Sequence, residues 1–190
     1  AAAARPGAAL TVRGVGLNPR RTALLDVLRR MGAQIETELT EEQGDPIGNI
    51  LVRGAQLSGT EIGGDEIPNL IDELPVISAI AALAKGDTVI RDAAELRVKE
   101  SDRIAMMAMH LRAFGVEVTE RPDGMTVSGP AKLTAPQEAL ESDGDHRIAM
   151  SAAVLATFCD GPVTINNTAC VDTSYPGFWN HLEQLGETVC

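Results

Sequence analysis

Three cations and two anions fall within eight residues near the middle of the chain, from Leu96 to Arg103. Downstream of this stretch, apolar residues recur at the i, i+3, i+4, i+7 spacing of a buried helical face, which predicts a helix with Ser101 as its N-cap. Arg103 then lies in the first turn, where a cation opposes the helix macrodipole at a cost of about 0.3–1 kcal/mol. An anion held at this point would use both the dipole and the guanidinium.

Other predicted helix starts carry residues of similar chemistry. If the helices lie parallel, their N-termini share one end of the molecule and form an anion site inside an acidic protein. Arg103 and Arg147 would supply planar donors for a carboxylate or phosphate. Asp72 and Glu100, beside these cations, are candidates for proton transfer. The whole set comprises Asp72, Lys99, Glu100, Arg103, Asp145, His146, Arg147, Thr173 and Ser174.

Each of these residues also has an ordinary structural interpretation. Asp72 alone could be a helix cap, Glu100 a surface partner of Lys99 or Arg103, and Arg147 a solvated arginine. Two arginines at two helix starts, where the dipole disfavours them, favour the functional interpretation.

An internal repeat predicts how the helices are arranged. Short predicted strands at Thr11-Val12, Thr88-Val89 and Val163-Thr164 lie about 75 residues apart, which indicates repeated units. Each leads to a helix closed by a glycine, and the units follow a β-α-β-β pattern with an extra Ala-rich helix between them. We therefore expect an α/β protein whose residues 1–190 form one domain of three pseudo-repeats, about 1–65, 66–140 and 141–190.

Composition limits the possible partners. The formal net charge of −11 and the absence of a basic cluster argue against a nucleic-acid surface. The longest apolar run, around Val76 to Ala84, is far shorter than the ~20 residues that span a bilayer, so no membrane partner is expected. Cys159, Cys170 and Cys190 show no ligand spacing, which favours reduced thiols, no metal site and a cytoplasmic protein.

The two ends suggest that the chain is a fragment. Ala1 to Gly7 occupies the position in the first unit that Ala81 to Gly86 occupies in the second, and the first residue is not methionine. The third unit stops at Thr188 to Cys190, within its first returning strand. We expect a piece of a longer protein.

Four stretches together resemble the C-terminal half of the 5-enolpyruvylshikimate-3-phosphate synthase family. They follow one another in the family's order over nearly the whole chain, and the second and third are highly specific in combination. The four stretches are Leu17–Thr22, Leu96–Arg103, Asp145–Met150 and Ser174–Phe178.

The resemblance implies a fold and a reaction. The fold is the enolpyruvyl transferase fold, an inside-out α/β barrel domain of repeated βαβαββ units with parallel buried helices, as one domain of a two-domain enzyme. The reaction transfers the enolpyruvyl (carboxyvinyl) group of phosphoenolpyruvate to the 5-hydroxyl of shikimate 3-phosphate through a tetrahedral intermediate that expels phosphate. It belongs to the shikimate pathway to chorismate and aromatic amino acids, and no metal or organic cofactor is implied.

The resemblance also implies roles for individual residues. Asp72 would accept the proton of the substrate hydroxyl, and Glu100 would handle protons at the enolpyruvyl methylene. Lys99 would hold shikimate 3-phosphate, whereas Arg103 and Arg147 would bind phosphoenolpyruvate. The missing N-terminal domain would supply most contacts to shikimate 3-phosphate, so we expect little or no activity from this chain alone.

Two positions depart from the family pattern, and two other functions stay open. Thr173 stands where some members carry a lysine that helps hold phosphoenolpyruvate, and Glu95 stands where others carry an asparagine near the substrate. The alternatives are UDP-N-acetylglucosamine enolpyruvyl transfer, which shares the fold and chemistry, and a non-catalytic scaffold module that binds anions.

Overall fold

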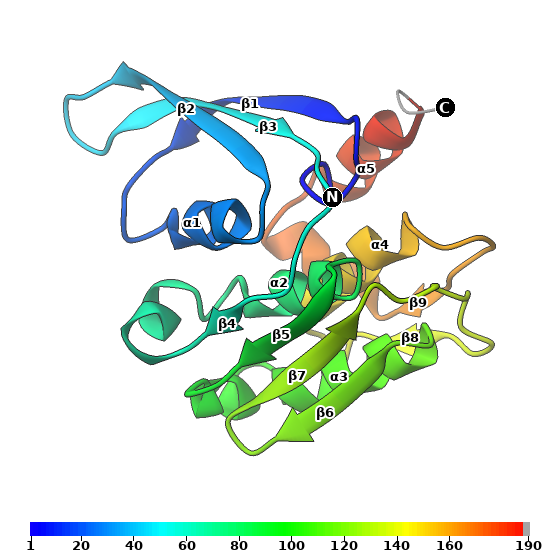
Figure 1. The fold of residues 1–190 in the computed structure, drawn as a ribbon. Coiled ribbons are helices and arrows are strands. Elements are labelled where there is room, and N and C mark those ends of the chain that lie inside the picture. Colours follow the sequence, from blue (N-terminus) through cyan, green and yellow to red (C-terminus); the bar gives the residue numbers. More distant parts are fainter. Residues whose placement is uncertain (188–190) are drawn as a thin grey trace.

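The first part of the chain forms a three-stranded antiparallel sheet with one covering helix (Figure 1). A computed structural model describes residues 1–187. In this sheet β3 (Ile47–Arg53) lies between β1 (Ala9–Gly16) and β2 (Gln34–Glu41). Helix α1 (Ala23–Arg30) buries Val27 and Leu28 in the core.

The middle of the chain forms a four-stranded sheet in the order β4-β5-β7-β6. The pair β4–β5 is parallel and the other pairs are antiparallel. A third, two-stranded sheet pairs β8 with β9 in parallel. The strands are β4 (Glu61–Ile62), β5 (Gly86–Ile90), β6 (Glu117–Arg121), β7 (Gly124–Gly129), β8 (Leu140–Glu141) and β9 (Ile165–Asn166).

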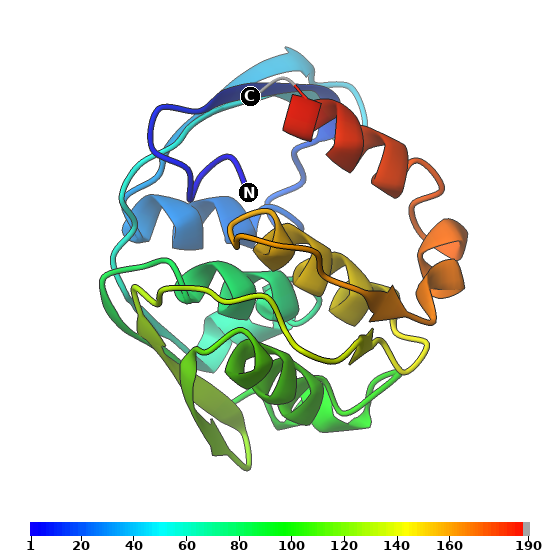
Figure 2. The ribbon, with the colours of Figure 1, turned by 90° about the vertical axis from the view of Figure 1, so that its right-hand side faces the viewer.

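Two buried helices lie between the first and second sheets (Figures 1 and 2). They are α2 (Leu74–Ala81), of whose eight residues seven are buried, and α4 (His146–Ala156). Alanines on both helices allow the close approach that such packing requires. The other helices are α3 (Arg103–Ala113), α5 (Phe178–Glu187) and the 3₁₀ helices η1 (Gly64–Asn69), η2 (Ala94–Val98) and η3 (Thr168–Thr173).

Side chains from α2, α3 and α4 meet in one core. Ile77, Ile104 and Ile148, one from each helix, are all 0% exposed. The α/β class expected from the sequence is confirmed. None of the helices in residues 1–187 combines the length and apolar character needed to cross a bilayer.

Several predicted boundaries are wrong. The helix expected at Asn18-Pro19 begins at Ala23, because the Asn18 side chain accepts a hydrogen bond from the Arg20 backbone N–H at 3.0 Å and makes a turn there. The last helix contains Gly186 instead of ending before it. The strands β4 and β8, of two residues each, are too short to show any alternation in the sequence.

The N-cap of α3 is a further correction. Asp102, not Ser101, caps the helix, and its carboxylate accepts from the Ala105 backbone N–H at 3.0 Å. Arg103 is therefore the first residue of the helix. Cys159 and Cys170 are free thiols, as expected, whereas Cys190 and the predicted strand at residues 188–190 lie outside the described residues.

Candidate active site

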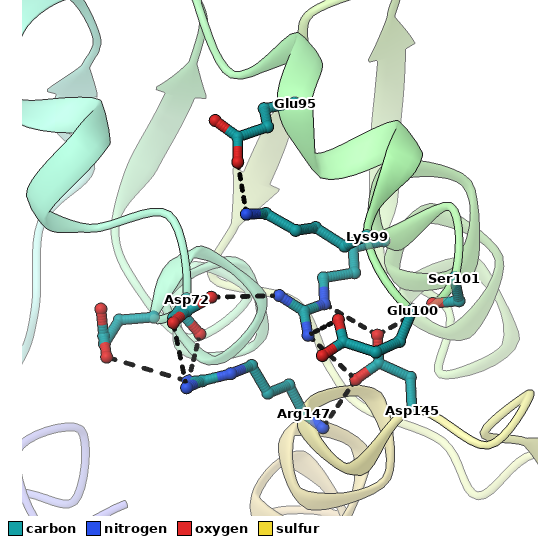
Figure 3. A network of polar contacts seen from close by, with 9 residues as sticks. Asp72, Glu95, Lys99, Glu100, Ser101, Asp145 and Arg147 are labelled. Carbon is teal, nitrogen blue, oxygen red and sulfur yellow. Dashed lines mark hydrogen bonds and ion pairs between the residues drawn. The ribbon is translucent and has the colours of Figure 1, made fainter.

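The guanidinium of Arg103 is the centre of a network of carboxylates, although its side chain is only 1% exposed. Its Nε donates to Asp145 Oδ2 at 2.7 Å and its Nη2 to Asp145 Oδ1 at 3.3 Å. The same Nη2 donates to Glu100 Oε2 at 2.6 Å, and Nη1 donates to Asp72 Oδ1 at 3.3 Å (Figure 3). Carboxylate side chains of the protein itself therefore surround Arg103, where a bound anion was expected.

Asp145 connects the N-termini of α3 and α4. It is 0% exposed, and it caps α4 by accepting from the Arg147 backbone N–H at 2.9 Å. The Ser101 hydroxyl donates to its Oδ2 at 3.1 Å. Burial by itself would raise the pKa of Asp145, but the Arg103 guanidinium and these donors outweigh burial and hold the pKa below its usual value. The pair therefore stays ionised.

Arg147 reaches from α4 to the segment before α2. Its Nη1 donates to the Asp72 backbone oxygen at 2.7 Å, and its Nη2 lies 3.3 Å from Asp72 Oδ2. Asp72 therefore lies between Arg103 and Arg147. The prediction that the two arginines share one end of the molecule is confirmed, since both contact the same carboxylate.

Glu73 belongs to this site and was missed in the sequence. Its Oε1 lies 3.8 Å from Arg147 Nη1, and it occupies the N-cap position of α2 without a side-chain capping bond. Burial raises the pKa of Glu73, and Asp72 adds to the rise, while the charge of Arg147 opposes it. A second acid directly after Asp72, at a predicted helix start, was the available signal.

Lys99 forms a separate ion pair, which no hydrogen bond or ion pair described in residues 1–187 connects to the Arg103 network. Its ammonium forms an ion pair with Glu95, four residues earlier on η2 (Figure 3). The Lys99 side chain is 25% exposed and the Glu95 side chain 65%.

The charges of the site are not those expected. Five carboxylates are paired with three cations, so the formal charge of the set is negative. The N-termini of α3 and α4 add positive dipole ends at the same place. The carboxylates are Asp72, Glu73, Glu95, Glu100 and Asp145, and the cations are Lys99, Arg103 and Arg147.

Thr173 and Ser174 do not join this network. The Thr173 hydroxyl donates to the Cys170 backbone oxygen at 2.7 Å, within η3, and the Ser174 backbone N–H donates to Val171 at 3.0 Å. Their predicted place among the helix starts of the site is therefore not supported by any hydrogen bond described for them. Within residues 1–187, no group of His, Cys, Asp and Glu side chains is arranged to hold a metal ion.

Comparison with known proteins places the chain in a family. The family model described as EPSP synthase (3-phosphoshikimate 1-carboxyvinyltransferase) matches residues 1–182. The chain belongs to the EPSP synthase family. A relative in this family, the 3-phosphoshikimate 1-carboxyvinyltransferase of Geobacter sulfurreducens, is 50% identical over 181 residues, which cover 95% of this chain and 42% of the relative. That of Roseiflexus sp. is 50% identical over 188 residues, 98% of this chain and 43% of the relative.

Solved structures agree with this family assignment. The EPSP synthase of Acinetobacter baumannii superposes with a TM-score of 0.90 at 38% identity, covering 97% of this chain and 43% of that protein. The enolpyruvyl transferase NikO of Streptomyces tendae has a TM-score of 0.75 at 21% identity, which shows the shared fold, and is covered to 41%. The resemblance inferred from the sequence motifs is confirmed, and the chain spans less than half the length of these EPSP synthase relatives.

Proposed function

We propose that this chain is part of a 3-phosphoshikimate 1-carboxyvinyltransferase. In this reaction the enolpyruvyl group of phosphoenolpyruvate is transferred to the 5-hydroxyl of shikimate 3-phosphate, and phosphate is released. The observation that carries the proposal is the placement of Asp72 between Arg103 and Arg147, with Glu100 on the same guanidinium. Two anionic substrates and two proton-transfer steps call for such a combination of arginines and carboxylates.

The exposure of these side chains suggests how the work is divided. Arg147 is 25% exposed and can turn a face of its guanidinium to the carboxylate of phosphoenolpyruvate. The Arg103 side chain is buried. Its Nη1 and Nη2 atoms contact Asp72 and Glu100, and these two carboxylates are partly exposed. Phosphoenolpyruvate therefore reaches Arg103 when Glu100 turns aside.

The carboxylates then carry the protons. Asp72 takes the proton of the 5-hydroxyl as the hydroxyl oxygen bonds to C2 of phosphoenolpyruvate. Glu100, protonated once it has left Arg103, gives a proton to the methylene carbon. In the second step the C2–O bond to phosphate breaks, Glu100 takes a proton back from the methyl group, and the proton held by Asp72 passes to the leaving phosphate. The arginines lower the cost of bringing the substrate charges together.

Further positive charge has to come from outside this set, because its five carboxylates outnumber its three cations. We propose that a second domain, corresponding to the remaining length of the relatives, closes over Lys99 and completes the shikimate 3-phosphate site. Residues 1–190 would then be one domain of three units, about 1–65, 66–140 and 141–190. The free thiols of Cys159 and Cys170 support a cytoplasmic location.

A steady-state assay of the full-length protein tests the proposal. With phosphoenolpyruvate and shikimate 3-phosphate we expect phosphate release and formation of the enolpyruvyl ether, and with UDP-N-acetylglucosamine no turnover. Arg103→Ala should raise the KM for phosphoenolpyruvate and lower kcat, whereas residues 1–190 alone should show no turnover. Full-length protein without turnover, or an Arg103→Ala variant with unchanged constants, would refute the proposal.

A further inference from the structure

Glu95 pairs with Lys99, and no other carboxylate in residues 1–187 contacts this cation. Within residues 1–187 the only side chain paired with the Lys99 ammonium is that of Glu95, and Glu95 has no second partner there. We propose that Glu95 is an internal competitor of the substrate phosphate for Lys99, and that it limits the affinity of the site for phosphorylated ligands. This inference rests on the proposed function, in which Lys99 holds shikimate 3-phosphate.

The two kinds of ion pair in the site differ in how readily they exchange. Arg103 and Asp145 are both buried, and separating them would leave two uncompensated charges in the interior. Glu95 is 65% exposed and lies on the short η2, so its carboxylate can rotate into water without disturbing the core. A ligand can therefore take over Lys99 at a lower cost than it could separate the Arg103–Asp145 pair.

A phosphate that binds at Lys99 has to displace the Glu95 carboxylate or lie next to its negative charge. Either way the free energy of the Glu95–Lys99 pair opposes binding. Exposed ion pairs of this kind are weak, so removal of the Glu95 charge corresponds to a gain in affinity of about two- to five-fold. The same competition favours release, because the product keeps the phosphate of shikimate 3-phosphate.

The test is Glu95→Gln in the full-length protein, a substitution that keeps the shape and removes the charge. We expect the Kd for shikimate 3-phosphate, measured by calorimetry, to fall about two- to five-fold, with the KM for phosphoenolpyruvate unchanged. Asp26→Asn is the matched control, because Asp26 forms an exposed i,i+3 ion pair with Arg29 on α1, outside the site. It should leave both constants unchanged.

A double-mutant cycle shows whether the effect passes through Lys99. In a Lys99→Met background, Glu95→Gln should no longer tighten binding. A gain of the same size in that background, or a Glu95→Gln protein that binds as wild type or more weakly, would overturn the proposal. In the last case Glu95 contacts the substrate directly.

Inorganic phosphate as the ligand separates this inference from the proposed function. Its Kd for the four proteins of the cycle, measured by calorimetry, requires no catalysis. A full-length protein without turnover refutes the transferase, whereas a tighter phosphate Kd that depends on Lys99 still supports the competition. If inorganic phosphate binds neither the wild type nor the Glu95→Gln variant, the inference is overturned even when the transferase is active.

Discussion

Arg103, the first residue of α3, and Asp145, the N-cap of α4, form a buried ion pair with Nε 2.7 Å from Oδ2. The pair joins two helix starts that are 42 residues apart in the chain. Because Arg103 also contacts Asp72 and Glu100, the same interaction stabilises the fold and fixes the geometry of the site.

Asp145→Asn should destabilise the protein by about 3 kcal/mol, because it leaves the buried Arg103 cation without the buried carboxylate that it contacts through both Nε and Nη2. Asparagine caps helices as well as aspartate does, so the loss of stability measures the effect of the missing charge and not of a missing helix cap. Chemical denaturation at pH 7 measures it. The native pKa of Asp145 is lowered, so this contribution is present above the ordinary value of about 3.8 and is lost as pH falls through the native pKa.

Asp102→Asn is the control for this substitution. Asp102 also caps a helix and is ion-paired, with Arg97, but both side chains are partly exposed. Its loss should cost no more than about 1 kcal/mol. Equal losses for the two variants would show that the buried pair contributes no more than an exposed one.

The stability should also depend on pH through His110. This side chain is 0% exposed, and its Nε2 lies 2.9 Å from the Glu141 backbone oxygen, while Nδ1 has no hydrogen-bond partner among the described residues. Burial lowers the pKa of His110 from its ordinary value of about 6.5. Below that pH the unfolded chain binds a proton that the native state does not, so the free energy of unfolding should fall as the pH is lowered from 6.5.

His110→Gln tests this contribution, because glutamine is neutral at every pH and can still donate to the Glu141 oxygen. Denaturation between pH 8 and pH 5 should show a flatter profile than wild type. A His110→Gln profile parallel to that of wild type would contradict the assignment.

The sequence predicted the site better than the contacts within it. Helix periodicity and dipole arguments identified Arg103, Arg147, Asp72 and Glu100, and the repeat placed them at one end of the molecule. Arg103 was expected to meet an anionic ligand, and its contact with Asp145 was not expected, because a partner 42 residues away has no local signal. Ser101 was expected to cap α3, but its hydroxyl donates to Asp145 instead, and that choice depends on the packing of α3 beside α4.

Arg147→Lys in the full-length protein should raise the KM for phosphoenolpyruvate about ten- to a hundredfold. A lysine can keep the charge, but it cannot donate to the Asp72 backbone and side chain and also present a planar face to a carboxylate. The loss of one charged hydrogen bond, about 1.5–3 kcal/mol, sets the size of the effect. Arg29→Lys, in the ion pair on α1, is the control and should leave the KM unchanged.

Gly124 begins β7, directly after a turn that is hydrogen-bonded to the residue before η2. It follows the turn at Pro122-Asp123, where the Asp123 backbone oxygen accepts from Ala93, just before η2. A Cβ at Gly124 would lie 2.0 Å from the Ile90 backbone oxygen. Backbone on the neighbouring strand cannot move aside as a flexible side chain can, so β5 and β7 would have to separate.

Gly124→Ala should therefore destabilise the protein by about 1–3 kcal/mol and weaken the attachment of η2 to the sheet. Thermal denaturation measures the first effect. Hydrogen exchange of the Ala93 amide, which donates to Asp123 at 2.8 Å, measures the second. Gly16→Ala is the matched control, because a Cβ there meets nothing within 4 Å. If both variants are as stable as wild type and the Ala93 amide exchanges at the same rate, close packing at Gly124 does not hold η2, and the position of Lys99 has another cause.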